Sequence, residues 1–210
     1  MSQSTADHGN ADVIDLLAGL APDSPLSRLR EQRPQARENA QLSFQALLEP
    51  ADPGSFVLAE RYAVASFVAL LHGFEEASAF YTDLLEDESS ELLPAVRDAA
   101  AEAATSGPFG HYRERGLASE STDGERWVPT PAQADALGDR LAAALVHAHL
   151  LVFRPREASP EAMRALVAAG WGADEIVSLS QLVAFLSFQL RVAWGLRVLA
   201  LHPAPEGAAR

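Results

Sequence analysis

The chain contains no cysteine and no lysine, so all 16 of its basic residues are arginines. Without cysteine it has no disulfides, thiolate metal sites, iron–sulfur clusters or thiol nucleophiles. Without lysine it can form neither a Schiff base with a substrate nor a Walker-type phosphate loop. These two absences remove several large classes of enzyme chemistry from consideration.

Positive charge is also scarce, because 29 acidic residues outnumber the 16 arginines and give a net charge of −13 at pH 7. Such a surface repels phosphate backbones, and no basic stripe is interleaved with aromatic residues, so we expect no nucleic-acid partner. No run approaches about 18 uninterrupted apolar residues. Residues 1–10 are polar and acidic, unlike a secretory signal. We therefore expect no membrane segment and a cytoplasmic protein.

Metal ligands are not grouped in a recognisable way. The acidic residues between positions 86 and 91 lack the spacing and central glycine of a calcium loop, and we interpret them as a solvated helix end and turn. His147 and His149 are two residues apart on an expected helix, so their side chains point to nearly opposite sides. We expect no metal and no cofactor.

Apolar residues recur at helical spacing along most of the chain, and no segment has the pattern of a strand. The sequence therefore predicts an all-α fold. We expect a disordered segment at 1–10, a single domain over 11–201 and a flexible tail at 202–210. Helices are predicted at about 12–20, 37–48, 58–71, 75–85, 92–104, 130–153, 159–170 and 174–201.

The longest predicted connection is the glycine- and proline-rich segment 106–129. Loops of this length inside compact domains often carry function. His111 and Tyr112 lie in it beside flexible glycines, so we consider them as ligand-binding residues of a loop that covers a pocket. The alternative is a solvated connection. The sequence Thr130-Pro131-Ala132-Gln133 then predicts a helix start with a capping box.

Two segments of the chain are similar to each other. Residues 60–71 align without a gap on residues 175–186, with Glu, Val-Ala and the last Leu in common. This predicts two related halves, about 11–105 and 130–201, although two buried helices in an alanine-rich chain also share letters by composition. Glu60 and Glu175 occupy equivalent positions. Either the helix dipole favours each carboxylate, or the two face a shared pocket.

The segments Leu58-Ala59-Glu60-Arg61, Ala165 to Val177 and Arg191 to Leu196 together carry a resemblance to a known family. In order and spacing they resemble the alkylhydroperoxidase-D-like group of the carboxymuconolactone-decarboxylase superfamily, over about residues 37–201. The resemblance implies an all-α, AhpD-like fold of two halves and a homo-oligomer.

The catalytic residues of that family do not occur here. Active members carry a glutamate, a Cys-x-x-Cys pair and a histidine, and the family pattern places these at Tyr62, Phe74, Ala77 and Tyr81. Because the attacking and resolving groups must be thiols, this chain cannot be a thiol peroxidase.

Some polar residues near that position remain candidates for chemistry. Tyr62 and His72 are ten residues apart, about three helical turns, and together with Tyr81 could perform acid–base catalysis. The alternative is that the tyrosines pack in the core and His72 ends a helix. Arg154 and Arg156 flank Pro155 and could hold a carboxylate, or simply favour a helix C-terminus. The ligand-binding candidates are Glu60, His111, Tyr112, His147 and Arg154.

These patterns lead to three functional hypotheses. The first is a cysteine-free scaffold that binds a small molecule or a partner. The second is a non-redox, decarboxylase-like enzyme that acts on a small organic acid by acid–base catalysis. The third is a structural or regulatory subunit. A homo-oligomer is expected in each case.

Overall fold

The computed structural model describes residues 12–202; the disorder predicted for 1–10 and nearly all of the predicted tail lie outside this range. The described residues form an all-α fold without strands, as the sequence predicts, and Gly110 and Thr122 form an isolated bridge. The helices are α1 (Val13–Ala18), α2 (Pro25–Glu31), α3 (Pro34–Leu48), α4 (Leu58–His72), α5 (Glu75–Ser89), α6 (Leu93–Ala103), α7 (Pro131–Phe153), α8 (Pro160–Ala168) and α9 (Ala173–Leu201), with short 3₁₀ turns η1 (Arg115–Glu120) and η2 (Pro155–Glu157).

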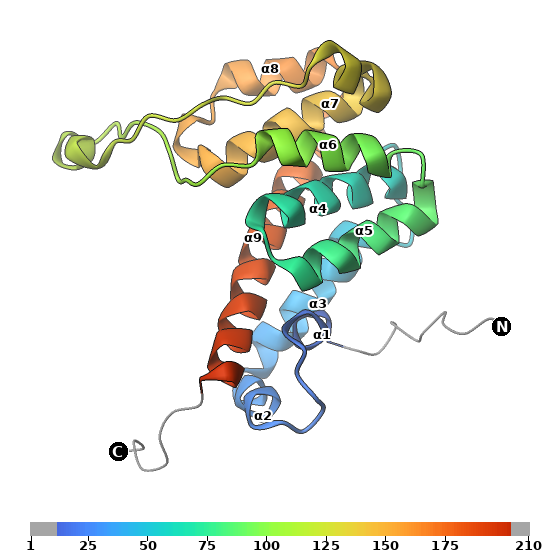
Figure 1. Ribbon diagram of the computed structural model, residues 1–210, viewed down its shortest axis with the longest axis vertical. Helices are drawn as coiled ribbons and strands as arrows, with labels where there is room; N and C mark the ends of the chain where they lie inside the picture. Colours follow the sequence, from blue (N-terminus) through green and yellow to red (C-terminus); the bar gives the residue numbers. More distant parts are fainter. Residues whose placement is uncertain (1–11, 203–210) are drawn as a thin grey trace.

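Helix α4 forms the centre of the core. Its residues 63–69 are completely or almost completely buried, because α5, α6, α7 and α9 all pack against it. Helix α9 runs along the length of the molecule (Figure 1). Its first half lies beside α4 and α7, and its last turns lie against α1 and α3. The two helices whose sequences are similar, α4 and α9, are thus direct neighbours in the core.

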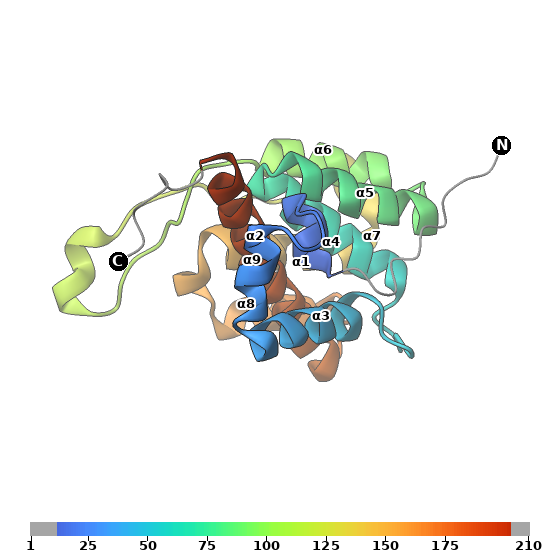
Figure 2. The same cartoon turned by 90° about the horizontal axis from the view of Figure 1, so that it is seen from below.

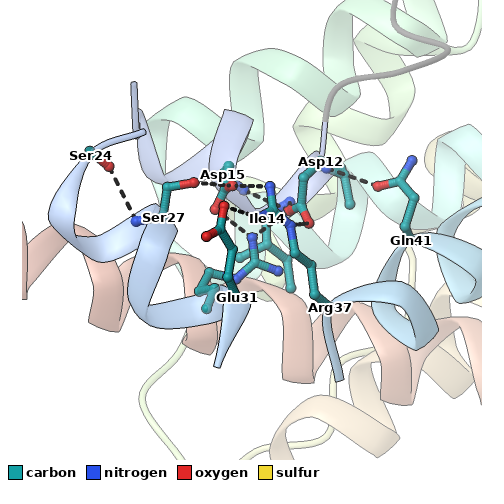
Figure 3. A network of polar contacts seen from close by, with 10 residues as sticks. Asp12, Ile14, Asp15, Ser24, Ser27, Glu31, Arg37 and Gln41 are labelled. Atoms are coloured by element: carbon teal, nitrogen blue, oxygen red, sulfur yellow. Dashed lines mark hydrogen bonds and ion pairs between the residues drawn. The ribbon is translucent and has the colours of Figure 1, made fainter. Parts of the chain in front are cut away.

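A polar network joins the three N-terminal helices (Figure 3). Asp12 caps α1 by accepting hydrogen bonds from the backbone N–H groups of Ile14 and Asp15. Arg37 of α3 donates to Asp12 at 2.9 Å and to Asp15 at 2.8 Å, and Arg30 of α2 binds both carboxylates as well. Charge-assisted hydrogen bonds of this kind hold α2, which the sequence analysis did not predict, in place against α1.

Several helix boundaries were predicted correctly and two were not. The capping box of α7 is confirmed: Thr130 Oγ1 accepts from the Gln133 N–H at 3.3 Å, and Gln133 Oε1 accepts from the Thr130 N–H at 2.9 Å. Helix α3 begins earlier than predicted, at Pro34. Helix α5 continues to Ser89 and not only to residue 85; the acidic residues at 86–88 form its exposed end and Glu91 lies in the turn that follows, which agrees with the interpretation of this run as a solvated helix end and turn.

Helices α7 and α9 are long and apolar enough, by length and composition, to cross a membrane. The same properties belong to the core helices of soluble proteins, and 56% of the apolar window of each helix is buried inside this molecule. The length and composition of α7 and α9 therefore do not show whether these helices lie in a membrane or in the core of a soluble protein.

The connection between α6 and α7, residues 104–130, forms an arm whose middle part, with η1 at its tip, projects away from the helices (Figures 1 and 2). Trp127, near its end, is buried against Phe67 of α4. At the base of the arm the Phe109 N–H donates to the carbonyl of Phe153 at 2.6 Å. The Phe109 ring lies so close to Gly124 that a Cβ atom there would be only 2.3 Å from it, so position 124 requires glycine. Arg154 binds the Gly124 carbonyl. These contacts fix the base of the arm to the end of α7.

Candidate functional site

Where the arm leaves the helices, a hollow of about 790 Å³ opens between the ends of α4 and α7 and the middle of α9. We call it the main hollow. Apolar residues such as Leu71, Phe153, Val183 and Ala184 form much of its wall, and segment 105–108 of the arm closes one side. Its charged or polar side chains include His72, Arg156, Ser180, Ser187 and Arg191.

A second, smaller hollow of about 220 Å³ shares His72 and Arg191 with the first. We call it the side hollow. Gly73, Phe74, Leu190 and Trp194 complete its lining. Phe74 and Trp194 meet edge to face, with ring centroids 5.4 Å apart. His72 and Arg191 thus lie at the boundary between the main hollow and the aromatic side hollow.

Among the described residues, neither hollow has an aspartate or a glutamate in its lining. This contrasts with the whole chain, whose net charge is −13. The charged side chains that line the hollows are Arg156 and Arg191. The local field therefore favours an anion although the molecule as a whole repels one.

His72 is the last residue of α4, and its Nε2 atom is buried without a hydrogen-bond partner in the described part of the chain. Burial, helped by the positive charge of Arg191, lowers the pKa of His72 to about 4. The ring is therefore neutral at pH 7. A buried polar atom without a hydrogen-bond partner destabilises the fold, so His72 is not placed here for the stability of the core alone.

The two arginines of the main hollow are held differently. Arg156 lies over the Tyr112 ring, 3.8 Å from its centroid, and donates to the Tyr112 hydroxyl at 2.5 Å. Arg191 donates only to the Ser187 carbonyl, at 3.3 Å, within residues 12–202. Stacking orients the first guanidinium, while the second retains donors for a ligand. Planar guanidinium groups suit carboxylate oxygens well.

The structure places the predicted ligand-binding residues at several different points. Tyr112 contacts Arg156, which lines the main hollow. His147 contacts Ser180, which also lines it; the distance from His147 Nε2 to Ser180 Oγ is 2.9 Å. Burial lowers the pKa of His147 to about 4, so it too is neutral at pH 7. His111 is exposed beside Asp123 on the arm, at 2.9 Å. Arg154 turns away from the hollow: it binds the Gly124 carbonyl of the arm and pairs with Glu157 of η2 at 2.7 Å.

Tyr62, His72 and Tyr81, the predicted acid–base residues, do not line one hollow together. Tyr81 is completely buried and donates its hydroxyl to Gln189, and burial raises its pKa far above the ordinary value. Burial, with the charges of Glu49 and Glu88, raises the pKa of Tyr62 to about 12. Of the three, only His72 belongs to the two hollows described above.

Glu60 and Glu175, the equivalent residues of the two similar helices, meet at one arginine. Arg140 of α7 binds Glu60 Oε1 at 2.8 Å and Glu175 Oε1 at 2.8 Å, and its guanidinium lies 4.1 Å from the Trp171 ring centroid. The hydrogen bond from Arg140 is the main reason that the pKa of Glu175 falls to about 2. The two carboxylates therefore share a cation, which ties α4, α7 and α9 together.

Arg191 was not among the ligand-binding residues predicted from the sequence. Arg156 was named together with Arg154 as able to hold a carboxylate, but only Arg154 was kept as a candidate, because the sequence does not say which of the two turns inward. Arg191 lies far from His72 in the chain, and no local pattern connects them. Among residues 12–202, no three His, Asp or Glu side chains are grouped to hold a metal ion.

The chain was compared with family models, with curated proteins and with solved structures, and none of the three comparisons found a match.

Proposed function

We propose that this protein is a cysteine-free, AhpD-like binding protein for a small organic anion, and that the main hollow is the binding site. One observation carries the proposal: among residues 12–202, the lining of the main hollow contains no acidic residue and includes His72, Arg156 and Arg191, in a protein whose net charge is −13. The all-α fold and the neighbouring, similar helices α4 and α9 support the relation to the AhpD-like group.

The geometry favours a monocarboxylate with an apolar portion. Arg191 would hold one carboxylate oxygen through charge-assisted hydrogen bonds, and Arg156, which lines the same hollow, would add positive charge. His72, which lies in the same lining, would add a ring N–H donor for the other oxygen. The apolar wall of Leu71, Val183 and Ala184 would cover the hydrocarbon part. A pocket of about 790 Å³ is within the range in which proteins hold small molecules.

Acid–base catalysis, the second hypothesis from the sequence, has less support. It needs a second proton-transferring group beside His72, and both Tyr62 and Tyr81 are hindered from ionising by burial. A histidine with a pKa of about 4 is also a weak base at neutral pH.

The proposal is tested with butyrate and its neutral analogue butyramide, using ligand-observed NMR to measure affinities in the millimolar range. We expect butyrate to bind and butyramide to bind at least about tenfold more weakly, because the amide lacks the charge. The Arg191→Gln substitution should lower the affinity for butyrate by about tenfold or more. Arg164→Gln, which changes an exposed arginine paired with Glu161 on α8, is the matched control and should leave the affinity unchanged. Equal binding of the two compounds, or no binding of either, would refute the proposal.

A further inference from the structure

The exposed indole of Trp194 is not explained by packing within the chain. Trp194 lies on α9 one turn after Arg191, and 52% of its surface is exposed. One edge touches Phe74, which is buried, and the remainder forms a wall of the side hollow. A large aromatic side chain that remains half exposed beside a hollow offers a surface for another ring.

We infer that the side hollow is an aromatic subsite, and that the ligand class of this protein is an aryl-substituted monocarboxylate whose carboxylate lies at Arg191 and His72 and whose ring packs on Trp194. The inference rests on the function proposed above. The two hollows share Arg191 and His72, so one ligand can reach both from a carboxylate held between them. A volume of about 220 Å³ accommodates one six-membered ring with a short linker.

The chemistry of the side hollow separates it from the main one. Its lining supplies two aromatic rings and the Leu190 side chain, and the only charged or titratable groups in it are the two that it shares. The main hollow contains the serine hydroxyls and Arg156. A ligand with its polar end toward the main hollow and its ring in the side hollow would match both linings. The reverse orientation would place the ring beside the guanidinium of Arg156 and the carboxylate beside the two aromatic rings, where the described residues of the side hollow supply no further cation.

The test compares butyrate with 4-phenylbutyrate, which differ only in the ring. We expect 4-phenylbutyrate to bind about tenfold or more tightly, as burial of one aromatic ring permits. The Trp194→Ala variant should lose this advantage and retain the affinity for butyrate. Val167→Ala removes an equally exposed apolar side chain from α8, outside both hollows, and should change neither affinity.

The outcomes distinguish the two proposals. If both carboxylates bind equally well, or if Trp194→Ala weakens them by the same factor, the aromatic subsite is wrong while the anion site stands. If 4-phenylbutyrate binds tightly but 4-phenylbutanol does so equally, the ring is recognised without the carboxylate, and both the assigned ligand class and the anion site fail. If neither carboxylate binds, both proposals fail.

Discussion

His72 is the residue whose protonation should change when a carboxylate binds. In the free protein it is neutral at pH 7, because burial and the charge of Arg191 lower its pKa to about 4. The other charged residue in the lining of the main hollow is Arg156, and His147 lies behind Ser180. In the described part of the chain, neither hollow has an acidic residue in its lining, and the nearest carboxylates along the chain are Glu75 and Glu76 at the start of α5. A carboxylate bound in the hollow would add an opposite charge beside His72, which raises the pKa of a histidine.

We therefore expect binding of 4-phenylbutyrate to take up protons. Because the pKa of His72 is higher in the complex than in the free protein, the affinity should rise as pH falls from 7.5 to 5.5, a range in which the ligand remains ionised. Isothermal titration in two buffers with different ionisation enthalpies measures the number of protons. His72→Asn should abolish the uptake, whereas His111→Asn, on the exposed arm, should preserve it. An affinity that is constant across this range would show that His72 stays neutral in the complex.

Helix α7 is interrupted by one glycine whose backbone conformation is not helical. Gly138 lies inside the helix with φ +74° and ψ 152°, a conformation that residues with a side chain rarely adopt. A Cβ atom there would touch nothing within 4 Å, so its effect would come from the backbone alone. The helix therefore bends at Gly138. This bend lies two residues before Arg140, whose guanidinium binds Glu60 and Glu175.

Two alanine substitutions should therefore change stability in opposite directions. Gly138→Ala should lower the free energy of unfolding by about 1–3 kcal/mol, because alanine is strained at this φ and ψ. Gly195→Ala, in a regular part of α9 with equally open space, should raise it by about 0.5–1 kcal/mol. Urea denaturation of both variants and the parent protein measures the difference. A stabilising Gly138→Ala variant would mean that α7 is straight in solution.

The sequence predicted most elements because their signals are local. The capping box at Thr130 and the helical periodicity of α4 and α9 need no tertiary context. Helix α2 was missed because it has seven residues and only two leucines, and what holds it is the contact of Arg30 with Asp12 and Asp15 from another helix. The end of α5 was placed too early because acidic residues resemble a solvated turn.

The site was harder to predict than the fold for the same reason. His72 was identified from its spacing to Tyr62 on one helix, but its position beside Arg191 arises only when α4 packs against α9. The choice between Arg154 and Arg156 depends on the arm, whose carbonyls attract Arg154 and leave Arg156 to stack on Tyr112.

Helix α9 has exposed apolar side chains that form a surface suited to the association of two copies of the chain. Phe188 and Leu199 are about half exposed and, being eleven residues apart, lie on the same face of the helix. After Glu175 the helix has no acidic residue, so repulsion between two copies of a protein of charge −13 is weakest here. We propose that this face joins two copies in the homo-oligomer that the sequence analysis predicted.

Light scattering after size-exclusion chromatography should accordingly give a mass above that of one chain. Leu199→Glu should shift it to the monomer, because two buried carboxylates would face each other without partners. Val167→Glu, a substitution at an equally exposed position on α8, should leave the oligomer intact. A parent protein that stays monomeric at concentrations of about 100 μM would contradict the proposal.

The projecting arm also has a consequence for proteolysis. Arg113 and Arg115 are exposed on it, far from the packed helices, and the chain offers trypsin no lysine. A nick there separates α1–α6 from α7–α9, and the two fragments remain interlocked because α4 packs against both α7 and α9. The cleaved protein would therefore behave as a pair of complementing fragments, in which each half can be labelled, exchanged or renatured with its counterpart.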